Sequence, residues 1–321
     1  MKSKLFIKGG VFFLIVIGVS FSALFLNPNY KNEYIGGVAF KLEKLKNTEG
    51  KKIVIIGGSN GNFGIDSRLM RKKLGVPVVN MALHGGLPFK YIIEQVKEYL
   101  NEGDVLILTK EYGGLKNQYW NKMNGIELPK IVTYDPSQIK ALFSDKVLFQ
   151  STITGIFKTI NFNIKRFPTW KKKSPGSVYS LEAFDEDNLK SEMLMGIYKK
   201  ETSKHNLPKI TKDIKFGKNL QLYSKEFDKK GIGFFITPPV IIDGYYDEKN
   251  ILPFWESFSS ISGIELLNAK KTYVYHRRYF FNSHYHTNAE GREIRTKSLV
   301  EDIKNNKSIV LKRLLNTAQN N

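Results

Sequence analysis

The chain has 321 residues, of which 41% are apolar, so it can form one large domain or two small ones around a substantial core. It contains no cysteine, which excludes disulfides, thiolate metal sites and a cysteine nucleophile. No basic helix, zinc finger or RNP-like motif accompanies the net charge of +20, which argues against nucleic-acid binding. Two interpretations of the charge remain: it reflects only a lysine-rich composition, or it attracts the protein to anionic lipid or acidic glycan.

The N-terminal segment is a candidate membrane anchor. Lys2, Lys4 and Lys8 precede an uncharged run over 9–26, which as a helix would be roughly 27 Å long and match the hydrocarbon core of a bilayer. The alternative is a cleaved signal peptide, but its small-x-small site is only weakly matched. We expect a short cytoplasmic tail over 1–8, a single-pass anchor over 9–26 and an extracytoplasmic body, since long domains translocate largely regardless of flanking charge.

Residues 27–50 are expected to form a stalk with one apolar helical face, and residues 51–305 a domain in which strands and helices alternate. Apolar runs predict strands at 53–56, 76–81, 104–109, 231–237 and 263–267. Apolar spacing predicts helices at 67–74, 89–100, 212–229 and 252–260, and a final one after Asn288. Short connections between them predict an α/β fold with a mostly parallel sheet.

A large insertion, about 113–211, interrupts this alternation after the third strand. It is expected to be mostly helical and to cover the carboxyl edge of the sheet. Its segment 147–167 predicts a helix that either packs within the insertion, which is the favoured interpretation, or lies on a membrane surface. Residues 306–321 are expected to form a C-terminal tail.

A glycine-rich loop follows the first strand, at its carboxyl end, where α/β proteins place their chemistry. The loop, Gly57 to Gly64, allows three interpretations: a tight turn, a phosphate cradle or a serine nucleophile at Ser59. The phosphate cradle fails because neither the dinucleotide register nor the P-loop lysine is present. The pattern Gly57-x-Ser59-x-Gly61 does match a nucleophile elbow, but it comes too early in the chain for an α/β-hydrolase.

A second informative stretch lies near the C-terminus, over 279–292. It contains Asn282, Ser283, His284 and His286, and it runs into the final helix. Thr287 or Asn288 can cap that helix, which puts His286 just before its first turn.

These two stretches together resemble the SGNH (GDSL-like) hydrolase superfamily, in its membrane-anchored, cell-envelope branch. Gly57-Gly58-Ser59-Asn60 is similar to the first block of the family, and the run from Asn282 to Gly291 is similar to the last, with Gly85 or Gly86 in the second-block position and a Pro-Pro pair after the fourth strand. The resemblance implies a flavodoxin-like three-layer sandwich, no cofactor, and ester chemistry in which Ser59 attacks an acyl carbonyl and His286 takes its proton.

The sequence departs from this family at two places. The aspartate expected before the histidine is replaced by Asn282 and Ser283, so Asn282 is the candidate for orienting the imidazole, with Asp243 or Asp247 as alternative acids. The third strand ends in Lys110-Glu111-Tyr112 and supplies no third-block asparagine. One oxyanion donor is therefore unassigned, beside the expected backbone N–H groups of Ser59 and of Gly85 or Gly86.

Three further residues are candidates for substrate binding: Asn60, His84 and Glu111. The alternative role of His84 is to form local hydrogen bonds, and the alternative role of Glu111 is to pair with nearby lysines. His276, His284 and His286 have no acidic partners at ligand spacing, so no metal site is predicted.

The resemblance implies a serine acyl esterase or O-acyltransferase that moves an acetyl-type group on a cell-surface polysaccharide. Similar anchored proteins, those of alginate O-acetylation and of D-alanyl transfer, work beside multi-spanning membrane acyltransferases, so such a partner is expected besides the glycan, the acyl donor and membrane lipid. The alternative is a catalytically inactive scaffold that binds glycan or organises an envelope assembly.

Overall fold

The computed structural model describes Ser22, Asn27 and residues 30–121, 127–169, 176–209 and 213–317. The predicted tail over 1–8 and the predicted anchor over 9–26 lie outside the described residues, apart from Ser22. Among the helices within these ranges, none combines the length and the apolar character needed to cross a bilayer.

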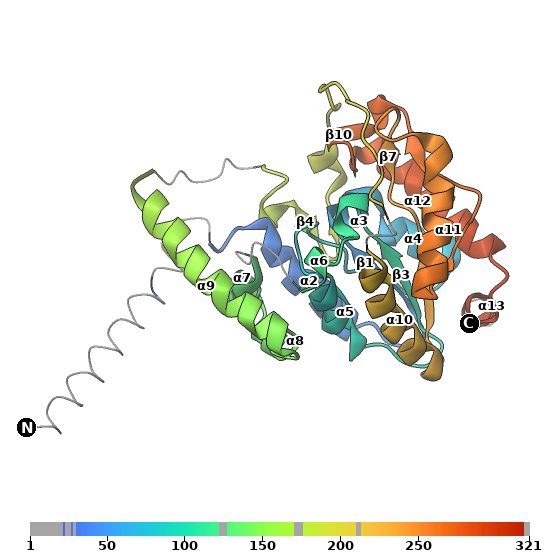
Figure 1. The fold of residues 1–321 in the computed structure, drawn as a ribbon, viewed down its shortest axis with the longest axis horizontal. Coiled ribbons are helices and arrows are strands. Elements are labelled where there is room, and N and C mark those ends of the chain that lie inside the picture. Colours follow the sequence, from blue (N-terminus) through green and yellow to red (C-terminus); the bar gives the residue numbers. More distant parts are fainter. Residues whose placement is uncertain are drawn as a thin grey trace, which may run out of the picture.

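A five-stranded parallel sheet forms the centre of the fold (Figure 1). Its order is β2-β1-β3-β6-β8, with β1 at Ile53–Gly57, β2 at Val78–Asn80, β3 at Val105–Thr109, β6 at Gly233–Ile236 and β8 at Glu265–Leu266. The predicted α/β class and parallel sheet are thus confirmed. Four of the five strands are shorter than expected, whereas β1 extends one residue further, to Gly57. Strand β6 stops just before Pro238 and Pro239, which have no N–H for a ladder.

Helices cover both faces of the sheet, because successive strand residues point to opposite sides. Val54, Ile56 and Leu106 belong to one apolar cluster, and Ile53 and Ile55 to the other. The helices that contribute to the first cluster include α2 (Gly37–Lys46), α5 (Phe89–Lys97), α10 (Ile214–Lys229) and α11 (Ile251–Ser262). Those that contribute to the second are α4 (Ser67–Leu74), α12 (Ala289–Asn305) and α13 (Ile309–Thr317).

Both flanks of the domain pack against it. In the segment expected as a stalk, Tyr34, Val38 and Leu42 are buried in the first apolar cluster, so the expected apolar face of this helix is part of the core. In the segment expected as a C-terminal tail, Leu311 and Leu314 of α13 are buried in the second cluster.

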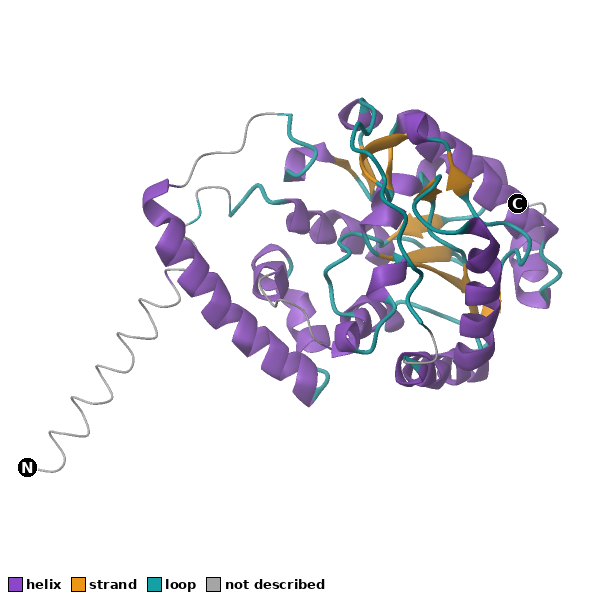
Figure 2. Cartoon of the chain, turned by 45° about the horizontal axis from the view of Figure 1, so that its top comes forward, coloured by secondary structure: helices purple, strands orange, loops and turns teal. Residues whose placement is uncertain are grey.

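The insertion after β3 is mostly helical in its described parts, and it adds one short hairpin. Its helices are α6 (Gln118–Asn121), α7 (Glu127–Tyr134), α8 (Ile139–Leu142) and α9 (Lys146–Arg166), and its antiparallel strands are β4 (Phe184–Asp185) and β5 (Asn188–Leu189). The longest of these helices, α9, lies at the edge of the molecule, away from the sheet (Figure 1, Figure 2).

Short elements complete the fold. Two small pairs of strands are β7 (Ile241–Ile242) with β9 (Val274–Tyr275), which are parallel, and β10 (Phe280–Ser283) with β11 (His286–Thr287), which are antiparallel. The 3-10 turns are η1 (Tyr34–Gly36), η2 (Tyr112–Gly114), η3 (Pro136–Gln138), η4 (Phe167–Thr169), η5 (Leu181–Ala183), η6 (Ser191–Leu194), η8 (Glu248–Asn250) and η9 (Arg277–Tyr279).

The glycine loop after β1 contains a helix that the sequence pattern did not predict. This helix, α3 (Ser59–Gly64), is built from glycine, asparagine, serine and one phenylalanine, most of which are poor helix formers. Tertiary packing supports it instead, since the side chains of Asn60, Asn62 and Phe63 are buried. Ser59 is therefore the first residue of a short helix.

Candidate active site

The backbone at the end of β1 presents Ser59. Gly57 has a φ of 155°, and a Cβ at this position would lie 1.7 Å from the carbonyl oxygen of Thr109, so the chain can turn here only with glycine. A Cβ on Gly58 would lie 2.1 Å from Oε2 of Glu111. Both glycines thus allow close approach between the serine loop and the end of β3.

A chain of hydrogen bonds joins Ser59, His286 and Asn282. The Ser59 Oγ lies 2.8 Å from Nε2 of His286, although the two residues are 227 positions apart in the sequence. The other ring nitrogen, Nδ1, lies 2.8 Å from Oδ1 of Asn282. His286 is the first residue of β11 and Asn282 lies in β10, so one hairpin carries both.

The orientation of Asn282 sets the tautomer of the imidazole. Its Nδ2 donates to the hydroxyl oxygen of Tyr179, at 2.9 Å, and this directs Oδ1 toward the ring. Because Oδ1 can only accept, Nδ1 of His286 carries the hydrogen and Nε2 of the neutral ring is left as an acceptor. That is the form of histidine that can take a proton from a serine hydroxyl.

The ring of His286 is held from one side by Phe63. The two ring centroids are 4.0 Å apart and the planes differ by 6°, so the rings are stacked. Burial lowers the pKa of His286 to about 4, although the carboxylate of Glu111 acts in the opposite direction. The imidazole is therefore neutral at pH 7 and ready to accept a proton.

Glu111 lies on the other side of Ser59. Its Oε1 is 3.1 Å from the serine Oγ, and it accepts a hydrogen bond from the backbone N–H of Asn60, at 2.9 Å. A Cβ built on Gly85 would lie 3.4 Å from the same oxygen, so the carboxylate lies between the two glycine loops. Burial acts to raise the pKa of Glu111, but the charge of Lys110 and hydrogen bonds from backbone N–H groups outweigh it, and the pKa is lower than usual.

Lys110 fixes this carboxylate from behind. Its Nζ lies 3.7 Å from Oε2 of Glu111 and donates to the carbonyl oxygen of Gly85, at 2.6 Å. The lysine side chain is 1% exposed, and the pair together carries no net charge into the interior. The alternative interpretation of Glu111, pairing with a lysine, is therefore seen in the structure together with its contact to Ser59.

The other predicted residues have local partners. The N–H of Gly86 donates to Nδ1 of His84, at 3.1 Å, which matches the local hydrogen bonding considered for that histidine. The side chain of Asn60 is buried and donates to Oγ1 of Thr109, so it faces β3. The oxyanion role of the Ser59, Gly85 and Gly86 N–H groups stays a prediction.

The alternative acids and His284 do not contribute to this hydrogen-bond chain. The Nδ1 of His286, which Asp243 or Asp247 was expected to reach, is bonded to Asn282, and Asp247 pairs with Lys249 instead. His284 stacks on Tyr245 with ring centroids 3.9 Å apart. In the described part of the chain, no group of three histidine or acidic residues could hold a metal ion.

Two contact residues of the site were missed from the sequence. Phe63 lies four residues after Ser59 in α3, so the two residues share one face of the helix. Had the helix been recognised from the sequence, this spacing would have placed Phe63 beside the serine. Tyr179 belongs to the insertion, where no pattern distinguishes it from the other tyrosines.

Comparison of the chain with protein-family models, with curated proteins and with solved structures finds no match.

Proposed function

We propose that the protein is an SGNH-like serine acyl esterase or O-acyltransferase. The observation that carries the proposal is the hydrogen-bond chain from Ser59 Oγ to His286 Nε2 and from His286 Nδ1 to Asn282 Oδ1, each link 2.8 Å long. A serine hydroxyl is a weak nucleophile unless an adjacent base removes its proton, and a neutral imidazole oriented by a third group is the usual base.

The topology of the sheet supports this proposal. When the strands of the main sheet are counted along the chain, their order is 2-1-3-4-5, which is the order of flavodoxin-like doubly wound sheets. In such sheets ligands bind outside the carboxyl ends of the strands. Ser59 and Glu111 follow the carboxyl ends of β1 and β3, two neighbouring strands of this sheet.

The proposed reaction proceeds through an acyl-enzyme. Ser59 Oγ attacks the ester carbonyl while its proton passes to Nε2 of His286. When the tetrahedral intermediate collapses, the bond to the leaving alcohol breaks, and that oxygen takes the proton from His286. Water or a sugar hydroxyl then gives its proton to His286, attacks the acyl-serine and releases the acid or the new ester, and the proton returns to Ser59.

The setting of the reaction is proposed from the sequence. The apolar run over 9–26 would hold the body at the outer face of the cell membrane. The net charge of +20 suits an acidic polymer or an anionic membrane surface. The proposed substrate is therefore a cell-surface polysaccharide carrying acetyl-type esters, and the proposed partner a multi-spanning acyltransferase.

A second candidate function is an inactive scaffold or glycan-binding component, and Glu111 is the observation that favours it. In the nucleophile elbow of α/β-hydrolases, the N–H of the residue after the serine stabilises the oxyanion. Here that N–H belongs to Asn60, and it donates to the Glu111 carboxylate. An enzyme that used the Asn60 N–H as an oxyanion donor would have to displace this carboxylate during the reaction.

A fluorophosphonate probe on the full-length protein in detergent distinguishes the two functions. We expect the probe to label the wild type and the control Ser257→Ala, which removes an exposed hydroxyl on α11, but not Ser59→Ala. His286→Ala is expected to label at least about a hundredfold more slowly, since general-base catalysis contributes about 10²–10⁴ in rate. Labelling that persists in Ser59→Ala would refute the nucleophile assignment.

A second measurement is needed because a catalytic serine can fail to react with the probe. Release of acetate from an acetylated polysaccharide or from a chromogenic acetate ester is expected for the wild type and not for Ser59→Ala. If neither labelling nor acetate release depends on Ser59, the scaffold function is the better account.

A further inference from the structure

The long helix α9 has an unusual distribution of side chains. Its buried residues recur every three or four positions and so lie on one face: Leu148, Thr152, Gly155, Thr159 and Asn163. Among them only Leu148 is a large apolar residue. This face packs on the other helices of the insertion. The fully buried positions of α9 are thus mainly small and polar, unlike those of an ordinary amphipathic helix.

Three large apolar side chains of α9 point outward, while its other apolar residues are buried or half-buried. Phe149, Phe157 and Ile164 are 41%, 66% and 56% exposed, and their spacing places them on one side of the helix. Phe143 extends this surface before α9, where its ring contacts that of Phe149, and Phe167 extends it after the helix. We call these five residues the α9 apolar surface. Exposed large apolar side chains gathered on one side of a helix are typical of a surface that binds a membrane or another protein.

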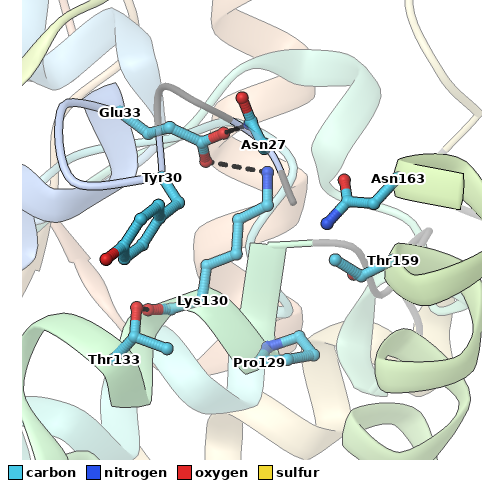
Figure 3. A pocket seen from close by; sticks show the side chains of 8 residues that line it. All are labelled: Asn27, Tyr30, Glu33, Pro129, Lys130, Thr133, Thr159 and Asn163. Carbon is cyan, nitrogen blue, oxygen red and sulfur yellow. Dashed lines mark hydrogen bonds and ion pairs between the residues drawn. The ribbon is translucent and has the colours of Figure 1, made fainter. Parts of the chain in front are cut away.

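A small cavity under α9 lies where the described chain enters the folded body (Figure 3). Asn27 and Tyr30 line this cavity together with Thr159 and Asn163 of α9. Within it, Glu33 pairs with Lys130 and accepts a hydrogen bond from Asn27 (Figure 3). Asn27 directly follows the uncharged run over 9–26 in the sequence, so an anchor formed by that run would end beside α9.

The charges on α9 indicate which surface lies there. Lys146, Lys158, Lys165 and Arg166 are exposed along the helix, and α9 has no acidic residue. An exposed apolar side flanked by basic residues is the pattern of a helix that lies in the headgroup region of an anionic bilayer. Each basic residue near such a surface adds to the electrostatic attraction.

We propose that α9 is an interfacial helix, with the α9 apolar surface inserted into the headgroup and acyl boundary of an anionic membrane. Together with the anchor, the helix attaches the body to the bilayer at two points and fixes its rotation about the anchor. The proposal rests on the proposed membrane anchor and does not depend on the chemistry of Ser59.

The absence of cysteine from the chain allows a direct test. The full-length protein carries a single cysteine in place of Phe157, labelled with the fluorophore NBD, and is reconstituted into vesicles of phosphatidylcholine and phosphatidylglycerol. The matched control carries the cysteine in place of Leu222 on α10, an apolar residue that is 69% exposed. Each variant is also measured with lipids that carry a spin label in the acyl chain.

The expected result is a blue-shifted emission and quenching by the spin-labelled lipid for the probe at 157, and neither effect for the probe at 222. Equal, water-like emission at both positions would overturn the proposal. So would protection of the probe at 157 only in native membranes and not in vesicles, because that would assign the surface to a protein partner.

Two further measurements separate this proposal from those on which it rests. Flotation of the protein with vesicles after alkaline carbonate washing reports the anchor independently of α9, and labelling of Ser59 reports the active site. The variant Lys158→Glu/Lys165→Glu is expected to reduce quenching of the probe at 157 several-fold while flotation is unchanged. Undiminished quenching in this variant would contradict a role for anionic lipid.

Discussion

The carboxylate of Glu111 and the hydroxyl of Ser59 lie 3.1 Å apart, and the backbone N–H next to the serine donates to the same carboxylate oxygen. The serine has one hydrogen for two acceptors, since Nε2 of His286 is 2.8 Å away on its other side. A negative charge thus lies beside the atom where an acyl-transfer reaction would develop another. The carboxylate also occupies the N–H of Asn60, which would otherwise be an additional oxyanion donor beside the predicted N–H groups of Ser59, Gly85 and Gly86.

Replacement of Glu111 by glutamine is expected to make Ser59 more reactive. The amide keeps the size of the side chain, removes the charge and no longer competes as strongly for the N–H of Asn60. The charge of Glu111 also raises the pKa of His286, so its loss makes the base somewhat weaker. Because one oxyanion donor is worth about 10²–10³ in rate, we expect a net increase of about tenfold or more in the rate of fluorophosphonate labelling.

The control for this variant is Glu290→Gln, which removes an exposed carboxylate in the first turn of α12. It is expected to label at the wild-type rate. Thermal melting must show that Glu111→Gln remains folded, since Lys110 loses its charged partner. A rate below that of the wild type in a folded Glu111→Gln protein would mean that the carboxylate assists the serine.

Replacement of Asn282 by aspartate is also expected to increase reactivity. The carboxylate would accept from Nδ1 of His286 and from the hydroxyl of Tyr179, so the existing contacts accommodate it. Its charge would stabilise the imidazolium and raise the pKa of His286 by about one to three pH units. Labelling at pH 7 should therefore be at least about tenfold faster than in the wild type and slower in Asn282→Ala. Equal rates in all three proteins would show that residue 282 does not act on the histidine.

The pH dependence of labelling tests the protonation state of His286. Burial lowers its pKa to about 4 from 6.5, so the neutral base persists to acid pH, and the rate should be flat from pH 8 to about 5. Below about pH 4 the rate should fall about tenfold per pH unit. An acid limb near pH 6.5 would show that the ring is not held neutral by burial.

The same pKa has a consequence for stability. The histidine binds its proton near pH 6.5 in the unfolded chain but only near pH 4 in the folded protein. The contribution of His286 to the free energy of unfolding is therefore complete above pH 6.5 and decreases as the pH falls from 6.5 toward 4. Circular dichroism at each pH therefore has to accompany the labelling rates, so that unfolding is not mistaken for protonation of the base.

Much of the fold could be predicted from the sequence, because its elements have strong apolar periodicity. The run at 53–56 and the spacing within 89–100 fixed a strand and a helix to within a few residues. The segment Ser59–Gly64 could not be recognised as a helix, since its residues favour turns and only tertiary packing makes them helical.

The candidate site was predictable only where a motif marks it. The residues Ser59, Asn282 and His286 stood out in two short motifs, and the structure brings them together. The contact of Glu111 with Ser59 depends on the register of β1 against β3, and that of Tyr179 with Asn282 on the path of the insertion. Neither arrangement leaves a periodic pattern in the sequence.

A buried carboxylate, Asp187, links the insertion to the sheet. Its Oδ2 accepts from Oγ of Ser67 and from the N–H of Asn80, both at 2.6 Å, and its backbone oxygen accepts from Nζ of Lys41. Asp187→Ala would leave the Ser67 hydroxyl and the Asn80 N–H without this acceptor, while the backbone oxygen would still accept from Lys41. We therefore expect a loss of about 3–5 kcal/mol in the free energy of unfolding, measured by urea denaturation. The control Asp185→Ala removes a half-exposed carboxylate of the same hairpin and should cost about 1 kcal/mol or less. Similar losses for both variants would show that the hairpin is held by its apolar contacts and that the buried carboxylate adds little.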